Sequence, residues 1–138
     1  MIPTWYTGGV KVAPISIADA LGRVAFLADR TPHTTPEEAA DAFAELGPYR
    51  NGAIYVGHYA GNSEWERHPH GDEIVAVIDG ETTLILLDAG VELRNHLGAG
   101  ELLVVPQNVW HRFETPAGVK ILTVTPQPTD RRVERPND

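Results

Sequence analysis

Residues that interrupt regular secondary structure constrain this fold more than any other feature: 13 glycines and 11 prolines divide the 138 residues into short segments. Most of these segments are rich in β-branched residues or alternate between apolar and polar residues, which is the pattern of strands joined by turns. The sequence therefore predicts an all-β domain. The expected strands are Arg23–Leu27, Ala53–Tyr59, Ser63–His68, Glu73–Ile78, Glu81–Leu87, Val91–His96, Leu102–Val105, Trp110–Glu114 and Val119–Thr125.

One segment departs from this pattern and predicts a short helix over Pro36–Leu46, packed on the outside of the β structure. Thr35 is a good N-cap, a proline occupies the first helical position, and Glu38 follows three residues after the cap. Apolar side chains then recur at helical spacing as far as Gly47.

Length and composition indicate one domain of ordinary size. With 42% hydrophobic and 22% charged residues, the chain is able to close a hydrophobic core. We expect a single domain over residues 1–138, with the motifs between about 53 and 125 and a polar, solvated or edge-lying tail over 126–138.

Charge and residue usage exclude several classes of partner and site. Because the chain has no cysteine, a metal would have to bind His, Asp or Glu, and nothing indicates an oxidising compartment. A net charge of −8 argues against a nucleic-acid partner, and the basic residues of the tail (Arg131, Arg132 and Arg135) form no basic stripe. No apolar stretch is long enough for a membrane span. The predicted location is the cytoplasm.

The first informative stretch is the segment from Glu64 to Glu73. Alternation along a strand places Glu66, His68 and, if the strand persists past Pro69, His70 on one face. After the turn, Glu73 opens the next strand and returns its carboxylate to the same interior, with Val75 and Val77 following inward.

The second stretch runs from Gly100 to His111, where a strand of buried character ends in a turn marked by Pro106. Together with His68 and Glu73, His111 completes two imidazoles and one carboxylate. Non-haem iron enzymes use this set of ligands to hold one face of a metal and leave the other open.

These two stretches resemble the two motifs of the cupin superfamily. In the first, Glu73 is followed by six residues and Gly80, as in the family, while Glu66 replaces the first histidine of the family's His-x-His pair. In the second, Gly100, Pro106 and His111 are in register, and Asn108 replaces a glycine. Asparagine tolerates the left-handed conformation that such a turn requires, so the second departure is mild.

The resemblance implies a double-stranded β-helix, or jelly-roll barrel, with a site inside it. It further implies frequent homodimers and a divalent ion, with iron, manganese, zinc or nickel as the usual choices.

Two ligand sets compete. In the first, Glu66, His68, Glu73 and His111 hold the ion; in the second, His70 pairs with His68 in place of Glu66. Spacing favours the first set, because only two residues separate His70 from Glu73. His70 is then a rim residue that reaches the ion or the substrate, and Glu66 is a ligand or a general base. A site without metal, in which Glu66 pairs with an arginine, stays open.

Three functions follow as hypotheses. The first is a metal-dependent enzyme, dioxygenase-like, acting on a small organic molecule. The second is a non-catalytic cupin that binds or senses a small ligand. The third is a metal-independent sugar epimerase or isomerase, for which Tyr55 and Tyr59 beside His58 are candidates, although a packed role suits His58 better. Trp65 and Trp110 each neighbour a ligand position and are expected to face outward, between sheets or at a dimer surface.

Overall fold

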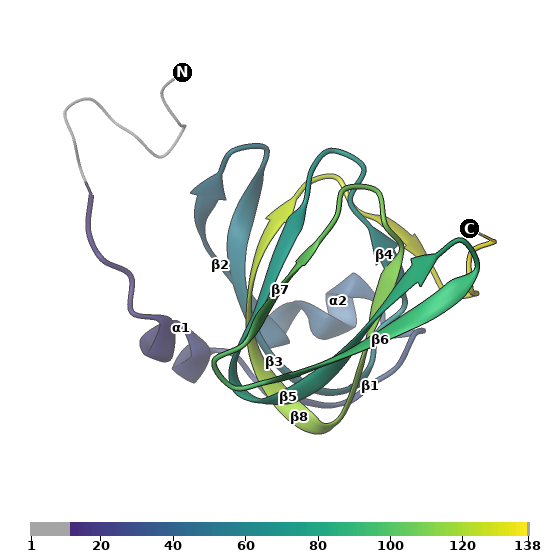
Figure 1. Cartoon of the computed structure of the whole chain (residues 1–138). Coiled ribbons are helices and arrows are strands. Elements are labelled where there is room, and N and C mark those ends of the chain that lie inside the picture. The colour runs from purple at the N-terminus through teal and green to yellow at the C-terminus, as the bar shows by residue number, and fades with distance from the viewer. Residues whose placement is uncertain (1–11, 138) are drawn as a thin grey trace.

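Strands make up most of the chain in the computed structural model, which describes residues 12–137 (Figure 1). The elements are, in chain order, helix α1 (Ile17–Arg23), strand β1 (Leu27–Arg30), helix α2 (Pro36–Ala39), 3-10 helix η1 (Ala40–Ala42), and strands β2 (Phe43–Tyr49), β3 (Gly52–Asn62), β4 (Trp65–Arg67), β5 (Glu73–Asp88), β6 (Val91–Gly98), β7 (Leu102–Val105), β8 (His111–Pro126) and β9 (Asp130–Arg132).

The sheet runs in the order β1-β3-β8-β4-β9, with β2 on β3, and with β5 pairing β6, β7 and β8. The long strands β5 and β8 each combine two predicted strands into one of 16 residues, and their pairing shifts register on both sides of Gly80. Gly80 has a φ of +80°, and a Cβ there would collide with the backbone oxygen of Gly118. Glycine thus permits the close crossing of β5 and β8. The result is the all-β jelly roll of the double-stranded β-helix, as the sequence predicted.

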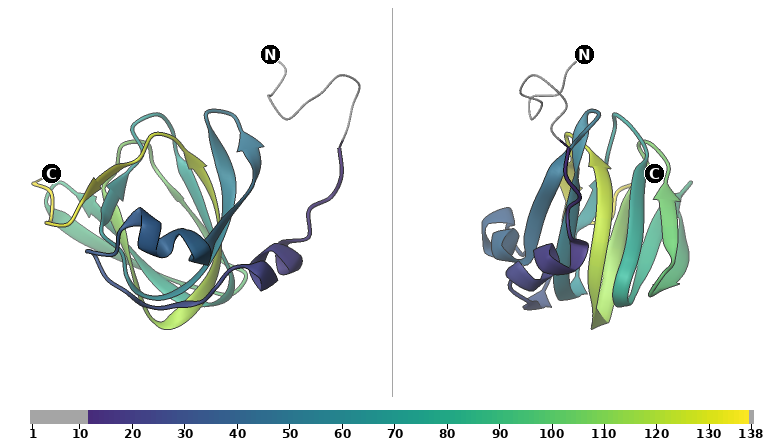
Figure 2. Two further views of the ribbon diagram at one scale, coloured as in Figure 1. Left: turned by 180° about the vertical axis from the view of Figure 1, so that it is seen from behind. Right: turned by 90° about the vertical axis from the view of Figure 1, so that its left-hand side faces the viewer.

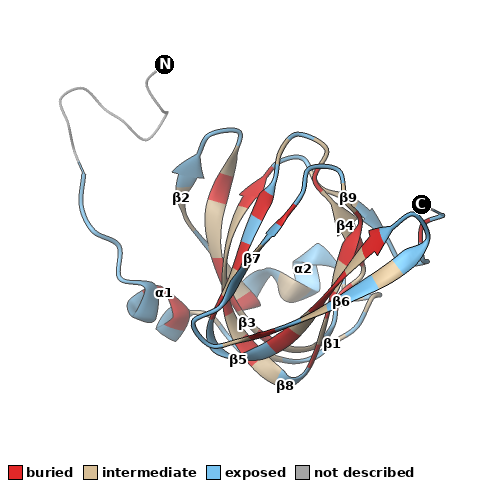
Figure 3. Cartoon of the chain, viewed as in Figure 1, coloured by how far each residue is buried: buried red, intermediate tan, exposed pale blue. Residues whose placement is uncertain are grey.

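Alternation along β5 separates the core from the surface (Figure 3). Val75 and Val77 are buried, whereas Ile74 and Ile78 are exposed. The inward side chains join a core with Leu84 of the same strand and with residues of β3, β6, β7 and β8, namely Tyr59, Leu97, Val105, Phe113, Val119 and Ile121. This core forms the floor and walls of the barrel interior.

A second, smaller cluster contains Trp65 and Trp110 with Ile85 and Leu87. The two residues that flank Trp65 in the chain, Glu64 and Glu66, line the interior cavity, so Trp65 faces the other way. Both indoles are buried, and the guanidinium of Arg67 lies 4.7 Å from the ring centre of Trp110. The two indoles therefore point away from the cavity and pack against each other's cluster neighbours, Ile85 and Leu87, within this chain.

The predicted helix begins where expected but ends early. Thr35 and Glu38 form a reciprocal capping box at the start of α2. The prediction that the helix continues to Leu46 is wrong, because Phe43 begins β2, which pairs with β3. The apolar spacing of Phe43 and Leu46 fits a strand as well as a helix, and pairing with β3 decides between them.

Two further predictions near the N-terminus need correction. The expected strand Arg23–Leu27 does not form, because Arg23 ends α1 and β1 begins only at Leu27. Helix α1 was not predicted, although its N-cap Ser16 and Asp19 three residues later are a recognisable signal. Within residues 12–137, neither helix has the length and apolar character needed to cross a membrane.

The polar tail is ordered along the edge of the sheet. Strand β9 pairs with β4, bringing Arg131 opposite Glu66 and Asp130 opposite Arg67. At one end of the barrel, α2 lies across the opening (Figure 2), where Pro36 and Ala39 line the interior cavity.

Candidate metal centre

Three side chains from separate parts of the sheet converge inside the barrel. His68 follows β4, Glu73 is the first residue of β5, and His111 is the first residue of β8. The ligand atoms that these residues offer all lie within 4.8 Å of one another, and all three residues are buried. The predicted geometric relationship between the two motifs is thus present.

The donor and acceptor atoms that face one another in this cluster have no hydrogen-bond partners. Oε1 of Glu73 lies 3.3 Å from Nε2 of His68 and 3.1 Å from Nε2 of His111. These three atoms are buried, and none has a hydrogen-bond partner. Buried polar atoms without partners are rare in proteins and call for a specific explanation, of which a bound ion is one.

The opposite side of each group is held by a polar partner. Nδ1 of His111 donates to the carbonyl oxygen of Val109 at 3.0 Å, which leaves its Nε2 with a lone pair directed at the cluster when the ring is neutral. Nδ1 of His68 lies 3.0 Å from Oγ1 of Thr129. Oγ1 of Thr125 donates to Oε2 of Glu73 at 2.6 Å. Such outer contacts orient metal ligands.

The electrostatics of the cluster favour opposite charges on its members. Burial by itself would raise the pKa of Glu73, but the imidazoles of His111 and His68 outweigh it and lower that pKa to about 2. Burial would likewise lower the pKa of His111, but the Glu73 carboxylate outweighs it and raises that pKa above 6.5. A cation is therefore favoured beside Glu73, whether a proton or a metal ion.

The residues present fit a divalent metal. Two imidazoles and one carboxylate form a recognised set for iron(II) and related ions, and all three donor atoms lack other partners. His68, Glu73 and His111 could hold such an ion, whose identity the ligands alone do not fix.

The cluster borders a cavity of about 320 Å³, within the usual range of small-molecule sites. Its apolar wall is formed by Phe43, Tyr59, Phe113 and Ile121, and its polar side chains include Arg30, Glu64, Glu66, Thr123, Gln127 and Arg131. Helix α2 and the residues before it cover one side.

Comparison with known proteins agrees with this architecture. A sequence model of the cupin domain matches residues 56–125, which is half of the chain. The chain belongs to the cupin family. A search of curated proteins finds no significant match to this cupin.

Solved structures share the fold of this cupin at low sequence identity. The protein NMB1881 from Neisseria meningitidis is 16% identical with a TM-score of 0.59, over 83% of this chain and 100% of that one. A cupin-2 domain protein from Shewanella frigidimarina is 21% identical with a TM-score of 0.52, over 65% and 79% of the two chains. A deletion mutant of Bacillus subtilis oxalate decarboxylase is 20% identical with a TM-score of 0.52, over 57% of this chain but only 23% of that one. This cupin thus matches less than a quarter of the decarboxylase.

Glu66 lies in the cavity wall of this cupin but not in the three-residue cluster. Its carboxylate pairs with Nη1 of Arg131 at 2.5 Å, and the same nitrogen lies 2.9 Å from the carboxylate of Glu64. The arginine pairing left open by the sequence is therefore present. A role for Glu66 as fourth ligand or general base stays a prediction.

His70 lies away from the cluster. It is exposed and lines a separate depression with Tyr49, Arg50 and Asp72. The structure therefore does not bring His70 together with His68, and its predicted part in catalysis stays a prediction.

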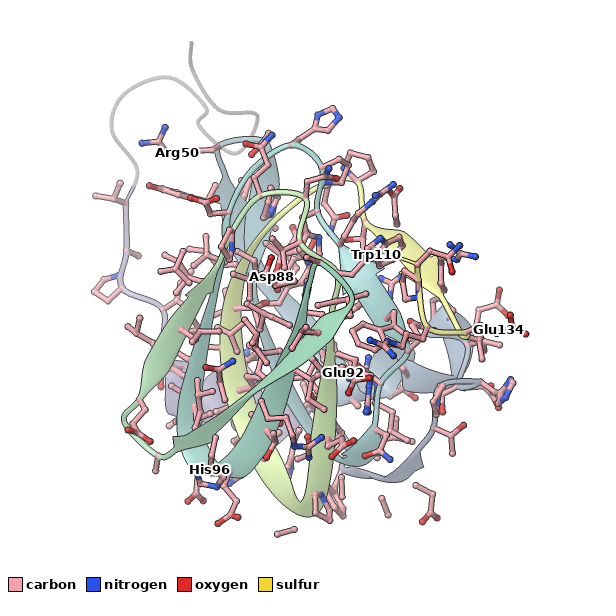
Figure 4. The ribbon with its side chains drawn as sticks, turned by 45° about the vertical axis from the view of Figure 1, so that its right-hand side comes forward. Arg50, Asp88, Glu92, His96, Trp110 and Glu134 are labelled. Atoms are coloured by element: carbon pink, nitrogen blue, oxygen red, sulfur yellow. The ribbon has the colours of Figure 1, made fainter. Side chains whose placement is uncertain are left out.

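The remaining histidines of interest also lie outside the cavity lining. His58 packs against Phe26, with the ring planes tilted and the ring centres 4.6 Å apart, and burial and the charge of Lys120 lower its pKa. Tyr55 and Tyr59 line the cavity without it, so His58 does not form the pair suggested for an epimerase. His96 is exposed beside Glu81, and Figure 4 places it well apart from Trp110.

Sequence reasoning missed several residues that complete the site. Thr125 contacts Glu73, Thr129 contacts His68, and Arg131 was predicted only as part of the polar tail. No local pattern marks them, because each contacts a partner more than fifty residues away in the chain. Arg30, at the end of β1, carries no motif signal either.

Proposed function

We propose that this cupin is a small metal-dependent enzyme, dioxygenase-like, that acts on a small organic molecule in the barrel cavity. The observation that carries the proposal is the convergence of three buried, unpartnered donor atoms, from His68, Glu73 and His111, beside that cavity.

The three residues would hold the ion from one side. When bound, iron(II) supplies the ability to combine dioxygen with an organic molecule, both oxygen atoms entering the product and the substrate supplying the electrons. Three protein ligands leave room for a substrate to approach the ion, which suits an enzyme better than a closed structural site.

The other cavity residues would position the substrate. Phe43, Phe113 and Ile121 provide an apolar wall that excludes water. Glu66, which pairs with Arg131 at the cavity wall, would accept a proton from a bound hydroxyl group. This ion pair also explains how a second carboxylate is retained near Glu73.

Metal analysis followed by oxygen uptake tests the proposal. The purified protein is loaded anaerobically with iron(II), manganese(II), zinc(II) or nickel(II), and bound metal is measured by mass spectrometry. Oxygen consumption with iron(II) is then followed with a panel of diols, diketones and carboxylic acids. We expect about one ion per chain and uptake with at least one compound.

Each outcome of this experiment has a clear meaning. Absence of metal at the cluster would refute the proposal. Stoichiometric metal without oxygen uptake for any compound would instead support a non-catalytic cupin that binds or senses a small ligand. His96→Ala, at an exposed histidine outside the cavity, is the control for nonspecific metal binding.

We further propose that this cupin forms a homodimer and is located in the cytoplasm. The outer face of β5 and β7 exposes the apolar side chains of Ile74, Ile78, Leu102 and Val104, and covering such a face is a common reason for association. Light scattering after size exclusion measures the mass directly, and a mass of one chain would refute the dimer.

A further inference from the structure

Arg30 occupies an unusual position for an arginine. It lines the interior cavity, and its guanidinium lies 4.5 Å from the ring centre of Tyr59 and 5.4 Å from that of Phe43. Within residues 12–137, no ion pair to a carboxylate is formed by Arg30, in contrast to Arg131 on the same cavity. A cavity-facing guanidinium stacked on aromatic rings retains its hydrogen-bond donors at the edge for another group.

The backbone holds Arg30 in this place. Strand β1 pairs in parallel with β3, with Arg30 opposite Gly61. Gly61 has a φ of +110°, and a Cβ there would collide with the backbone oxygen of Arg30. Any other residue at position 61 would push the end of β1 away from the barrel, so the location of Arg30 depends on this glycine.

The charges around the cavity leave Arg30 uncompensated. Arg131 is shared by Glu64 and Glu66, so that group carries one excess negative charge. A divalent ion beside Glu73 would carry one excess positive charge, which offsets it. The charge of Arg30 then has no counterpart among the residues that line the cavity.

We infer that the small molecule bound in this cavity carries one carboxylate, that Arg30 binds this carboxylate, and that the apolar part of the molecule lies against Phe43 and Tyr59. The inference names the substrate class and rests on the proposed function for its link to catalysis. A carboxylate fits better than a phosphate, because a phosphate carries more charge and three acceptor oxygens, whereas a single unpaired guanidinium faces this cavity from the described residues.

Matched pairs of acids and amides test the inference. Binding of acetate and acetamide, of butyrate and butyramide, and of benzoate and benzamide is measured by ligand-observed NMR or calorimetry, on both metal-loaded and metal-free protein. At least one acid should bind roughly tenfold to a hundredfold more tightly than its amide, the range expected for a charge-assisted contact. Inorganic phosphate is included as a competitor and should displace the acid only weakly.

Variants assign the preference to Arg30. Arg30→Gln should abolish the preference for the acid, and Arg30→Lys should retain part of it. Arg50→Gln is the matched control, because Arg50 also stacks on a tyrosine, 5.4 Å from the ring centre of Tyr49, but lies outside this cavity. A merely structural role for Arg30 would alter stability and would not alter the ratio of acid to amide affinity, so thermal unfolding of each variant is measured in parallel.

The outcomes separate this inference from the proposed function. Equal affinity for acid and amide in every pair, or an unchanged preference in folded Arg30→Gln, would overturn the inference while metal binding and oxygen uptake could still stand. If the protein proves unable to bind metal but still prefers the acid to the amide, the role of Arg30 is supported and the proposed metal-dependent enzyme is refuted. Tight displacement by phosphate would replace the carboxylate with a phosphate ligand and so refute the assignment.

Discussion

Nε2 of His111 lies 3.1 Å from Oε1 of Glu73, and both atoms are buried without a hydrogen-bond partner. Burying two polar atoms without partners costs free energy, because both lose their contacts with water. A cation bound between them would offset this cost.

Loss of the His111 imidazole should strongly weaken metal binding. In His111→Ala the ion would keep one imidazole and one carboxylate, and we expect affinity to fall by more than about 100-fold, since even the outer partners of ligands are worth 10–100-fold. Calorimetric titration with zinc(II) or manganese(II) measures the change. His96→Ala should bind as the wild type does; a similar loss there would point to binding outside the cluster.

Removal of an outer contact should weaken binding by less. Thr125 donates to Glu73 at 2.6 Å, so Thr125→Val leaves one carboxylate oxygen without its donor, and a loss of about 10–100-fold is expected. Thr82→Val is the matched control, because Thr82 is buried and contacts Thr115 at 2.7 Å away from the cluster. Equal metal affinity in the two variants would contradict this role for Thr125.

Metal affinity should fall as the pH decreases. The Glu73 carboxylate raises the pKa of His111, so in metal-free protein the imidazole gains a proton at a higher pH than an ordinary histidine does. The ion must displace this proton, and its binding should weaken as the pH falls through that raised pKa. Titrations between about pH 8 and pH 6, in buffers of different ionisation enthalpy, measure affinity and proton release together. An affinity independent of pH in this range would exclude His111 as a ligand.

Acid should destabilise the metal-free protein through Glu73. Because its pKa is lowered from 4.5 to about 2, Glu73 contributes stability that is complete above pH 4.5 and is lost as the pH falls toward 2. The contribution is on the order of 3 kcal/mol. Urea unfolding at pH 6 and pH 3 measures it, with Glu73→Gln as the reference. The wild type should lose more stability than the variant; equal losses would mean that Glu73 has an ordinary pKa.

Asn108 should tolerate glycine better than alanine. Its φ is +66°, and its backbone N–H donates to the carbonyl oxygen of His68 at 2.9 Å. Asn108→Ala should cost about 1 kcal/mol in the free energy of unfolding, because alanine resists this conformation, whereas Asn108→Gly should be nearly neutral. Chemical unfolding distinguishes the two, and an alanine variant as stable as the glycine variant would contradict this explanation.

Much of the fold could be predicted because its signals are local. Alternation placed Val75 and Val77 inside with Glu73, and turn residues located β7 within its observed bounds. The position of Asn108 followed from its tolerance of positive φ. Predictions failed where one pattern suits two structures, as at Phe43, which fits both a helix and the strand that pairs with β3.

The sequence by itself determined that the chain is all-β and that His68, Glu73 and His111 meet. Strand period and motif spacing, which carry these predictions, are properties of neighbouring residues. Tertiary structure alone decided that Glu66 faces Arg131, that Thr125 and Thr129 contact Glu73 and His68, and that Arg30 lines the cavity. These contacts depend on which strands pair and in what register, and pairing energies are summed over the whole sheet. No local pattern carries that information.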